Sequence, residues 1–502
     1  MNTLVDLDVA LEHFDPVIGL EVHVELSTTT KMFSPAPNPA ASLEDFAPNT
    51  AISPVCLGLP GSLPVVNAEA VRSSIALGLA LGCEIRPTSR FARKNYFYPD
   101  LAKNYQISQY DEPIAHDGVV EVELDDQSVW SVEIERAHME EDAGKLTHVG
   151  GNTGRIQGAE YSLVDYNRAG VPLVEIVTRP IAGAGEKAPQ LARAYVQTIR
   201  DIVIALGVSQ ARMERGNLRC DANVSLMPKG ATEFGTRTET KNVNSFRSIE
   251  RAVIYEIRRQ ATLLLEGTAI TQETRHWHED TGQTSPGRPK SDADDYRYFP
   301  EPDLLPVSPD PDWVEEIRQS LPETPSVRRR RLREAWQLAE TDFQALINAD
   351  LLDVVEETIN QGTTPASAKK WWLGELSRIA NDRDVLVTSL LTPAQVVELD
   401  SHITQGTIND KMAREVLLAM VDGEGTAAEI IDARGLAVVS DDGALRAAID
   451  EALSAQPDVL EKIREGKVQA AGAIIGQVMK ALGGQADAQR VRELILEQAS
   501  QS

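Results

Sequence analysis

The sequence has 502 residues, 42% of them apolar and 25% charged, which is ordinary for a globular protein with a sizeable core and two to four domains. No stretch approaches the roughly 18–20 uninterrupted apolar residues of a membrane-spanning helix. Residues 1–14 contain acids but neither Lys nor Arg, which excludes the basic start of a signal peptide. A cytoplasmic protein without membrane segments is therefore expected.

The net charge of −27 at pH 7 argues against general nucleic-acid binding, because an acidic surface repels phosphate. The exclusion is incomplete, since RNA binding needs only a local basic patch. The three cysteines, Cys56, Cys83 and Cys220, are scattered and form no CxxC pair. They predict neither a disulfide framework nor a zinc site.

The first 300 or so residues mix strand-like and helix-like segments. Apolar and polar residues alternate as in strands in four segments: 17–26, 119–124, 132–136 and 221–226. Two segments have helical spacing: 68–81 and 188–206. This pattern predicts an α+β domain with a largely antiparallel sheet. The segment 281–306 is rich in Gly, Pro and Asp and is predicted to be a loop at the domain boundary.

The rest of the chain has helical character. Six segments show helical apolar spacing: 312–321, 326–339, 343–357, 366–380, 393–405 and 410–420. A polar, Gly-containing break at 422–425 precedes a last helical unit. The sequence therefore predicts three domains, the second and third entirely helical: 1–310, 311–425 and 426–502.

Two features of the helical region attract attention. Trp371 and Trp372 are expected to be core residues. The arginines of RRRRLR, residues 328–333, point in several directions around a helix. A solvated helix surface and a contact with RNA both stay open for them.

The strand 17–26 carries the first candidate site. With a period of two, Glu21 and His23 project side by side from the face opposite Ile18 and Leu20. A carboxylate beside an imidazole suits a hard divalent cation or a charged ligand. A solvated strand face with ordinary polar residues is the alternative.

The segment 92–110 combines Arg93, Lys94 and Lys103 with several aromatic residues. Basic side chains interleaved with aromatic rings can grip phosphate and stack on a base. The same composition also occurs in ordinary tight loops around a proline such as Pro99.

Three successive acids, Glu140, Glu141 and Asp142, repel one another unless a positive charge lies among them. A Mg²⁺ ion bridging nucleotide phosphates would supply that charge. An acidic surface turn is the alternative.

Two further segments follow. Strand alternation aligns Arg237, Glu239 and Lys241 on one face, which is either a surface ion-pair ladder or the lining of a site for an anionic ligand. Asp221 and Asn223 share a face in the segment before it, where a structural role is also open.

Familiar catalytic motifs are missing from the sequence. It has neither a GxxxxGK[ST] phosphate loop nor a GxGxxG fingerprint between a strand and a helix, so any ATP site would be unconventional. It has no GxSxG nucleophile and no cysteine in a glutaminase context. The chain is not expected to make its own ammonia.

Taken together, these segments resemble one family, the B subunits of the aspartyl/glutamyl-tRNA amidotransferases, along essentially the whole chain. Eight segments carry the resemblance in the same order: IGLEVHVEL, LGLPGSLPVVN, ARKNYFYPDLAKNYQISQY, HMEEDAGK, DYNRAGVPLVEIVT, RCDANVSL, TETKNVNSF and DYRYFPEPDLLP. Each is weak alone, but eight in order are strongly specific.

The resemblance implies an N-terminal cradle domain with a kinase-type active site, a helical domain, and a small YqeY-like tail that contacts tRNA. It also implies a complex with the A subunit, an amidase that hydrolyses glutamine, and the small C subunit. ATP would phosphorylate the side-chain carboxylate of Glu-tRNA(Gln) or Asp-tRNA(Asn), and ammonia would then attack the acyl phosphate. The residue chemistry agrees, because phosphoryl transfer needs mainly positioning and neutralised charge.

The resemblance also assigns residues. Four are expected to bind Mg²⁺: Glu21, His23, Glu141 and Glu239. Three are expected to be catalytic: Lys94, Glu140 and Asp221. Lys94 would neutralise phosphate charge, and it would bind ATP together with Arg237 and Lys241. Adjacent strand residues face opposite ways, so Glu140 and Glu141 should differ in role. Glu140 would hold a second ion or line the path of ammonia.

The tail offers four basic residues for tRNA phosphates: Lys462, Arg464, Lys467 and Lys480. One departure concerns the loop that reads CPVC in some members of the family. This chain has Ser53 there, three residues before Cys56. No structural zinc is expected, and packing has to hold the loop.

Two other functions stay open. The first is a stand-alone carboxylate–amine ligase for a free amino acid, which has no evident need for the helical C-terminal region. The second is a non-catalytic tRNA-binding scaffold whose acidic clusters are solvated surface. The sequence also leaves open whether Glu-tRNA(Gln), Asp-tRNA(Asn) or both are the substrates.

Overall fold

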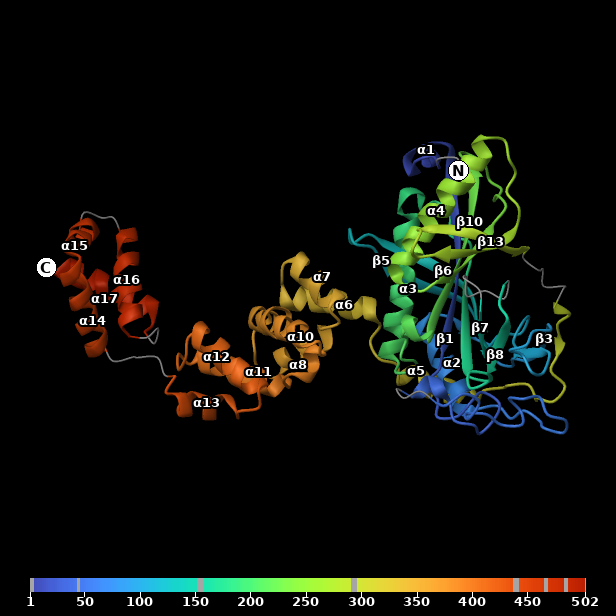
Figure 1. Ribbon diagram of the computed structural model, residues 1–502, viewed down its shortest axis with the longest axis horizontal. Helices are drawn as coiled ribbons and strands as arrows, with labels where there is room; N and C mark the ends of the chain where they lie inside the picture. The colour runs from blue at the N-terminus through green and yellow to red at the C-terminus, as the bar shows by residue number, and fades with distance from the viewer. Residues whose placement is uncertain are drawn as a thin grey trace. The chain divides into compact units, whose positions relative to one another are not determined.

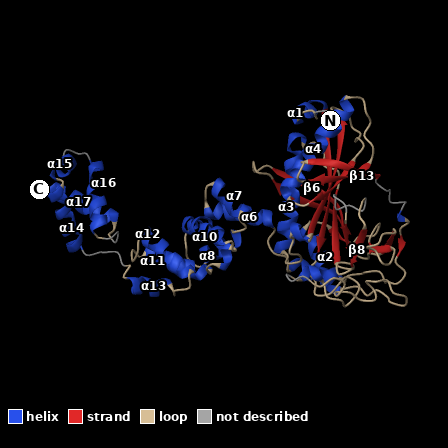
Figure 2. Cartoon of the chain, viewed as in Figure 1, coloured by secondary structure: helices blue, strands red, loops and turns tan. Residues whose placement is uncertain are grey.

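The computed structural model describes residues 4–42, 46–150, 158–289, 296–436, 442–464, 468–482 and 486–501. It divides into two compact units, Met1–Arg330 and Arg331–Ser502. The first is built around a sheet and the second from helices (Figures 1 and 2), which confirms the predicted fold class. Within the described ranges, no helix has the length and apolar character needed to cross a membrane.

The main sheet has nine strands in the described part of the chain. Their spatial order is β13 (Gln283–Pro289), β12 (Glu273–His278), β11 (Thr238–Val243), β10 (Leu218–Pro228), β1 (Phe14–Glu25), β9 (Pro172–Thr178), β6 (Val129–Glu141), β5 (Ala115–Glu123) and β2 (Glu84–Ile85). All neighbouring pairs are antiparallel except β11 and β12, which run parallel. The four strands that the sequence predicts all lie in this sheet.

Two smaller sheets accompany it. One has the order β14 (Phe299–Pro300), β3 (Ala92–Asn95) and β4 (Tyr105–Ser108), and the other pairs β7 (Lys145–Val149) with β8 (Tyr161–Asp165). The prediction of a loop over 281–306 is therefore wrong in part, because this segment contains both β13 and β14. Both are short edge strands without an alternating apolar face, so the periodicity could not reveal them.

Helices cover one face of the main sheet. They are α1 (Leu7–His13), α2 (Ala68–Ala80), α3 (Ala188–Ala205) and α4 (Phe246–Leu265), and α5 (Pro311–Gln319) packs against α2. Short 3₁₀ turns in this unit lie at Pro39–Ala41, Gly185–Lys187 and Met213–Arg215.

The two faces of β1 separate the core from the polar side of the sheet. Ile18, Leu20, Val22 and Val24 are at most 1% exposed and pack in the same core as residues of α3 and α4. Strand alternation then directs the residues between them, Glu21 and His23 among them, to the face away from these helices.

The second unit is helical in all its described elements. It begins within α6 (Pro325–Trp336). Its other helices are α7 (Glu340–Asn348), α8 (Leu352–Asn360), α9 (Pro365–Lys369), a π-helical segment (Lys370–Leu376), α10 (Ser377–Arg383), α11 (Pro393–Thr404), α12 (Asp410–Val421), α13 (Ala427–Arg434), α14 (Asp442–Ala455), α15 (Pro457–Arg464), α16 (Ala471–Ala481) and α17 (Ala488–Gln501). Short 3₁₀ turns lie at Val387–Ser389 and Val468–Ala470.

One predicted helix is broken. The segment 343–357 forms the end of α7 and most of α8, because Asp350 takes a left-handed conformation with φ of 57°. A left-handed residue ends a helix by turning the chain away from the helical path. The apolar spacing continues across the break, so the sequence pattern did not reveal it.

The tryptophan pair lies in the core, as expected. Trp371 and Trp372 are fully buried. Their indole Nε1 atoms donate to Asp400 Oδ1 at 3.0 Å and to Thr358 Oγ1 at 2.8 Å, respectively.

The helical unit contains two separate hydrophobic cores, one between Leu332 and Ile431 and one between Leu445 and Ile495. The first unit's core reaches Ile317 of α5, beyond the predicted boundary at 310. Likewise, Ile430 and Ile431 of α13 lie beyond the predicted boundary at 425 but pack in the core of the domain before it.

The arginines of α6 form ion pairs with acids of the protein itself. Arg329 contacts Asp201, Arg330 lies 3.1 Å from Glu121, Arg331 lies 2.9 Å from Glu356, and Arg333 lies 3.1 Å from Glu340. These contacts favour the surface interpretation of the arginine run over an RNA contact.

Candidate active site

A polar pocket lies on the face of the sheet away from the helices. Its lining comes from β1, β3, β4, β6 and β9, from the segment after β4, and from the segments before β11, β12 and β14. The lining residues are Glu21, Lys94, Ser108, Gln109, Tyr110, Arg136, His138, Glu140, Glu175, Arg237, Gln272, Tyr296 and Tyr298. Segments far apart in the sequence thus build one site.

The register of three strands creates the first cluster of ligating groups. On β9, Glu175 lies directly opposite His23 of β1 on one side and His138 of β6 on the other. Glu175 Oε2 is 3.4 Å from His23 Nε2 and 3.6 Å from His138 Nε2. Glu140, two residues after His138, completes the group. His23, Glu140 and Glu175 offer three ligand atoms that all lie within 4.8 Å of one another.

A second cluster lies beside it on β1, β10 and β11. Glu21 is opposite Asp221, and Glu239 is opposite Asn223. Ligand atoms of Glu21, Asp221 and Glu239 lie within 4.8 Å of one another. Asn223 Nδ2 donates to Glu21 Oε1 at 2.9 Å, and Thr274 Oγ1 donates to Glu239 Oε2 at 2.8 Å. Both bonds fix the orientation of their carboxylates.

Lys241 belongs to this second cluster. Its Nζ atom donates to Asp221 Oδ2 at 2.6 Å and lies 3.7 Å from Glu239 Oε1. Burial alone would lower the pKa of Lys241, but Asp221 and Glu239 outweigh it and raise the pKa. The aligned Arg237, Glu239 and Lys241 therefore include both an ion pair and part of the pocket, because Arg237 lines it and is exposed.

The first cluster holds acids under mutual repulsion. Burial, followed by the neighbouring Glu175, raises the pKa of Glu140 to about 7. Burial also opposes the ionisation of Glu175, yet His138 and His23 hold its pKa well below the ordinary value. Glu175 therefore ionises before Glu140, and its negative charge then opposes the ionisation of Glu140.

Lys94 supplies one fixed positive charge at the pocket. Burial would lower its pKa, but the nearby Tyr298, Glu140 and Glu175 outweigh burial and raise the pKa. Its Nζ atom lies 4.9 Å from the centroid of the Tyr296 ring. Lys94 is therefore a cation at neutral pH, positioned beside the carboxylates.

His138 is neutral at pH 7, because burial lowers its pKa to about 4. Its Nδ1 atom is buried and has no hydrogen-bond partner among the described residues. Such an unsatisfied buried ring nitrogen, on a histidine whose other ring nitrogen faces Glu140 and Glu175, calls for a functional explanation.

The residues present fit a Mg²⁺ ion. Carboxylate oxygens are the protein ligands that Mg²⁺ prefers, and it usually keeps substrate phosphates and water as the rest of its shell. Each cluster offers at least two carboxylates within reach of one ion, and the first cluster also offers an imidazole.

The structure does not bring Glu141 together with the other predicted ligands. Glu140 and Glu141 alternate along β6, so Glu141 points to the other side. There it contacts Lys103, and its Oε1 atom accepts from the backbone N–H of Ile107 at 3.0 Å. The expected difference in role between the two neighbouring acids agrees with this geometry.

Among the acidic, basic and histidine residues of the pocket, sequence reasoning missed three: Arg136, His138 and Glu175. Glu175 left the clearest signal, because it is the one acid in the otherwise apolar strand segment PLVEIVT. An acid inside a buried strand is costly and so indicates a special role. Which residues it meets depends on the strand register, which the sequence does not contain.

The predicted tRNA-binding residues lie in the C-terminal helices. Lys480 is exposed on α16. Lys462 and Arg464 lie in α15, but their side chains are outside the described residues, as is Lys467 altogether.

The Cys56 loop is held by polar contacts and packing. Cys56 Sγ lies 3.3 Å from Ser53 Oγ, 3.6 Å from Ser34 Oγ and 3.6 Å from Lys31 Nζ. Burial would raise the pKa of this thiol, but the Lys31 ammonium and the serine hydroxyls outweigh burial and lower it. Ser53, the departure noted in the sequence, is thus a hydrogen-bond partner of Cys56.

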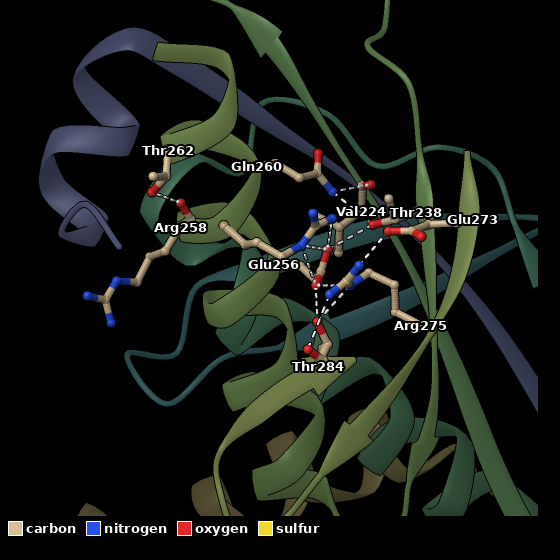
Figure 3. A network of polar contacts seen from close by, with 10 residues as sticks. Val224, Thr238, Glu256, Arg258, Gln260, Thr262, Glu273, Arg275 and Thr284 are labelled. Atoms are coloured by element: carbon tan, nitrogen blue, oxygen red, sulfur yellow. Dashed lines mark hydrogen bonds and ion pairs between the residues drawn. The ribbon is translucent and has the colours of Figure 1, made fainter. Parts of the chain in front are cut away.

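A buried network of polar contacts supports β11, the strand that carries Glu239, together with β12 and β13 (Figure 3). Glu256 of α4 is fully buried and accepts from Thr238 of β11 at 2.9 Å and from Thr284 of β13 at 2.6 Å. Arg275 of β12 lies 3.1 Å from the same carboxylate, and Arg259 donates to it at 2.7 Å. This network ties one helix to three strands, and Thr238 directly precedes Glu239.

Comparison with known proteins agrees with this architecture. Residues 16–315 match the family described as the GatB/GatE catalytic domain, and residues 353–498 match the one described as the GatB domain. The first match contains every pocket residue named above.

Three similar proteins share one name, that of the B subunit of aspartyl/glutamyl-tRNA(Asn/Gln) amidotransferase. The protein of Clavibacter sepedonicus is 66% identical over 499 residues, which cover 99% of each chain. That of Leifsonia xyli subsp. xyli is 65% identical over 498 residues and 99% of each chain. That of Streptomyces coelicolor is 59% identical over 495 residues, 98% of this chain and 97% of its own. The chain therefore belongs to the family of aspartyl/glutamyl-tRNA(Asn/Gln) amidotransferase B subunits, which uses ATP and transamidates misacylated tRNAs.

Proposed function

We propose that the pocket transfers the terminal phosphoryl group of ATP to the side-chain carboxylate of Glu-tRNA(Gln), Asp-tRNA(Asn) or both. Ammonia then attacks the acyl phosphate, and phosphate leaves as the amide forms. The observation that carries the proposal is the meeting of His23, Glu140 and Glu175 with the cation Lys94 in one pocket. A carboxylate needs a leaving group before an amine can replace its oxygen, and such a site can supply one.

We assign the residues according to these contacts. His23, Glu140 and Glu175 would hold one Mg²⁺ ion, and Glu21, Asp221 and Glu239 would hold a second. When bound, the ions neutralise charge on the phosphate oxygens. Lys94, Arg136 and Arg237 line the pocket and would meet the phosphates of ATP.

Lys241 has a different part in this proposal. It already neutralises Asp221 and Glu239 at short distance, so it would balance the charge of the second cluster and contact phosphate only when an ion displaces it. Glu141 is not assigned as a ligand, because its carboxylate is engaged with Lys103 and the backbone of Ile107.

The relatives' designation as B subunits implies an amidotransferase of several different chains. We propose that the partners are a glutamine-hydrolysing amidase, the A subunit, which delivers ammonia, and a small C subunit. The tail would bind tRNA phosphates through Lys462, Arg464, Lys467 and Lys480. The division into 1–310, 311–425 and 426–502, the absence of a structural zinc and a cytoplasmic location remain proposals.

The experiment uses the complex reconstituted with the amidase and the small C subunit, and follows ADP release in the presence of glutamine and Mg²⁺. ADP release should require Glu-tRNA(Gln) or Asp-tRNA(Asn) and should be lost in Glu140→Gln. The matched control is Glu133→Gln, the same change at an exposed acid of the same strand, β6.

Other outcomes would reject the proposal. ADP release that needs only free glutamate or aspartate would indicate a small-molecule ligase. Binding of tRNA without ADP release from any substrate would leave a non-catalytic scaffold. Full activity of Glu140→Gln would place the phosphoryl transfer outside this pocket.

A further inference from the structure

A pair of stacked tyrosines lies at the pocket. Tyr110, just after β4, stacks on Tyr298, just before β14, with ring centroids 4.3 Å apart and an interplanar angle of 10°. Both rings line the pocket together with Lys94 and Glu140. Tyr110 is 43% exposed although one face of its ring is covered by Tyr298. The pair therefore presents an aromatic surface next to the polar groups of the site.

The chain holds Tyr298 in this place with several independent contacts. The residues after it form β14, which pairs with β3 at Phe299 opposite Arg93. Arg93 binds the carboxylate of Glu301 through two hydrogen bonds, of 2.7 and 2.9 Å. Asn95 Nδ2 donates to the carbonyl oxygen of Arg297 at 2.9 Å.

Backbone strain also indicates that the surrounding structure holds Tyr298 in place. Arg297, between Tyr296 and Tyr298, has a φ of 46°, a backbone conformation that residues other than glycine rarely adopt. Such conformations persist only where the surrounding structure enforces them, and they concentrate at ligand sites. Here the clamped strand β14 enforces the turn that brings both tyrosines to the pocket.

We propose that the exposed face of Tyr110 is a platform on which an adenine ring stacks. This inference rests on the proposed function, because both substrates of that reaction carry an adenosine: ATP itself, and the 3′-terminal nucleotide of tRNA to which the amino acid is esterified. A flat aromatic ring beside a cation matches a nucleotide, whose base is flat and whose phosphate is anionic. Lys94, 4.9 Å from the Tyr296 ring centroid, places that cation within the same aromatic group.

The test compares Tyr110→Ala, Tyr110→Leu and Tyr110→Phe in the reconstituted complex. Tyr110→Phe keeps the flat ring, whereas Tyr110→Leu keeps apolar bulk against Tyr298 without it. Tyr161→Ala, at a tyrosine of β8 that is 54% exposed and outside the pocket lining, is the matched control. KM for ATP and KM for the aminoacylated tRNA are measured separately by ADP release, and thermal unfolding confirms that each variant is folded.

The Ala and Leu variants should raise one KM by about 5- to 140-fold, the loss expected for one base stacked on one aromatic ring. The Phe variant and the Tyr161→Ala control should keep the KM values of the natural protein. A rise in KM for ATP assigns the platform to the adenine of ATP, and a rise in KM for the tRNA assigns it to the 3′-terminal adenosine. The inference is overturned when the Ala variant leaves both KM values unchanged, or when the Phe variant loses as much as the Ala variant.

The Glu140→Gln variant separates this inference from the proposed function. When Glu140→Gln abolishes ADP release while the Tyr110 variants keep both KM values, only the platform is rejected. When Glu140→Gln keeps ADP release, the proposed function itself is rejected.

Discussion

The two compact units differ in what they bury. In Met1–Arg330, ten of the described acidic, basic and histidine side chains are buried: Glu25, Lys31, His138, Glu140, Glu141, Asp142, Glu239, Glu256, Arg275 and Glu301. In Arg331–Ser502, Asp400 is the one buried ionisable side chain among the described residues, and Thr358 and Thr363 are the other buried polar ones. Burying a charge is costly, so its frequency in the first unit requires an explanation.

The partners of the buried acids supply that explanation. In the helical unit, Asp400 accepts from Trp371 and serves packing. In the first unit, Glu256 is matched by Arg259 and Arg275, and it likewise serves structure. Glu140 is instead held beside Glu175, and its pKa rises to about 7. Burial together with the neighbouring Glu175 therefore sets Glu140 apart from Glu256 and Asp400, whose partners lie within the chain.

The substitution that should reduce activity most is that of Lys94. Replacing it by Ala should lower the rate of ADP release by about 10³-fold, the loss typical of one group that stabilises transition-state charge. Lys145→Ala, at an exposed lysine of β7, should leave the rate unchanged. A Lys94→Ala complex that releases ADP at the normal rate would show that the reaction does not need the positive charge of Lys94. The pocket would then not differ electrostatically from the rest of the first unit in the way proposed.

The second effect is a gain in stability, not a loss of activity, and it concerns Glu140. The pKa of Glu140 is raised from an ordinary value of 4.5 to about 7, so its ionised form destabilises the fold, by roughly 3 kcal/mol in full. Without divalent metal, Glu140→Gln should be more stable than the natural protein above pH 7. The difference in stability should shrink as the pH falls from 7. It should vanish below about 4.5, where Glu140 is neutral in both the folded and the unfolded protein.

Thermal unfolding in EDTA between pH 4 and 8 measures this difference. Added Mg²⁺ should reduce it by stabilising the natural protein selectively. A Glu140→Gln variant that is less stable at pH 8 would mean that the carboxylate is adequately paired within the chain and that the first cluster has no need of a cation.

The smallest effect concerns the helical unit. Trp371→Phe removes the indole N–H that donates to buried Asp400 and should cost about 1–3 kcal/mol of stability. It should leave the binding of Mn²⁺, used as a substitute for Mg²⁺, unchanged in titration calorimetry. Weakened Mn²⁺ binding in this variant would show that the helical unit contributes to the metal site, and the contrast between the units would fail.

Much of this architecture was predictable from local sequence pattern. Alternation identified β1 and the shared face of Glu21 and His23, and helical spacing identified α2, α3 and the succession of helices after residue 311. The resemblance to a family gave Lys94, Asp221 and Glu239 their expected roles, and all three lie at the pocket or in the second cluster beside it.

The rest depended on contacts distant in sequence. Glu175 meets His23 and His138 only through the register of β1, β9 and β6, which no local pattern encodes. Tyr298 reaches Tyr110 only because β14 pairs with β3, and β14 is too short to leave a periodic signal. The break at Asp350 is a backbone conformation that the continuing apolar spacing concealed.

In the proposed reaction, the pocket of the first unit moves a phosphoryl group onto the side-chain carboxylate of the aminoacylated tRNA. The most direct test uses Glu-tRNA(Gln) labelled with ¹⁸O in that carboxylate and analyses the phosphate that the reconstituted complex releases. Each phosphate formed by the natural protein should contain one ¹⁸O atom, and Glu175→Gln should form no phosphate above background. Unlabelled phosphate, or labelled phosphate formed at the normal rate by Glu175→Gln, would contradict the proposed reaction.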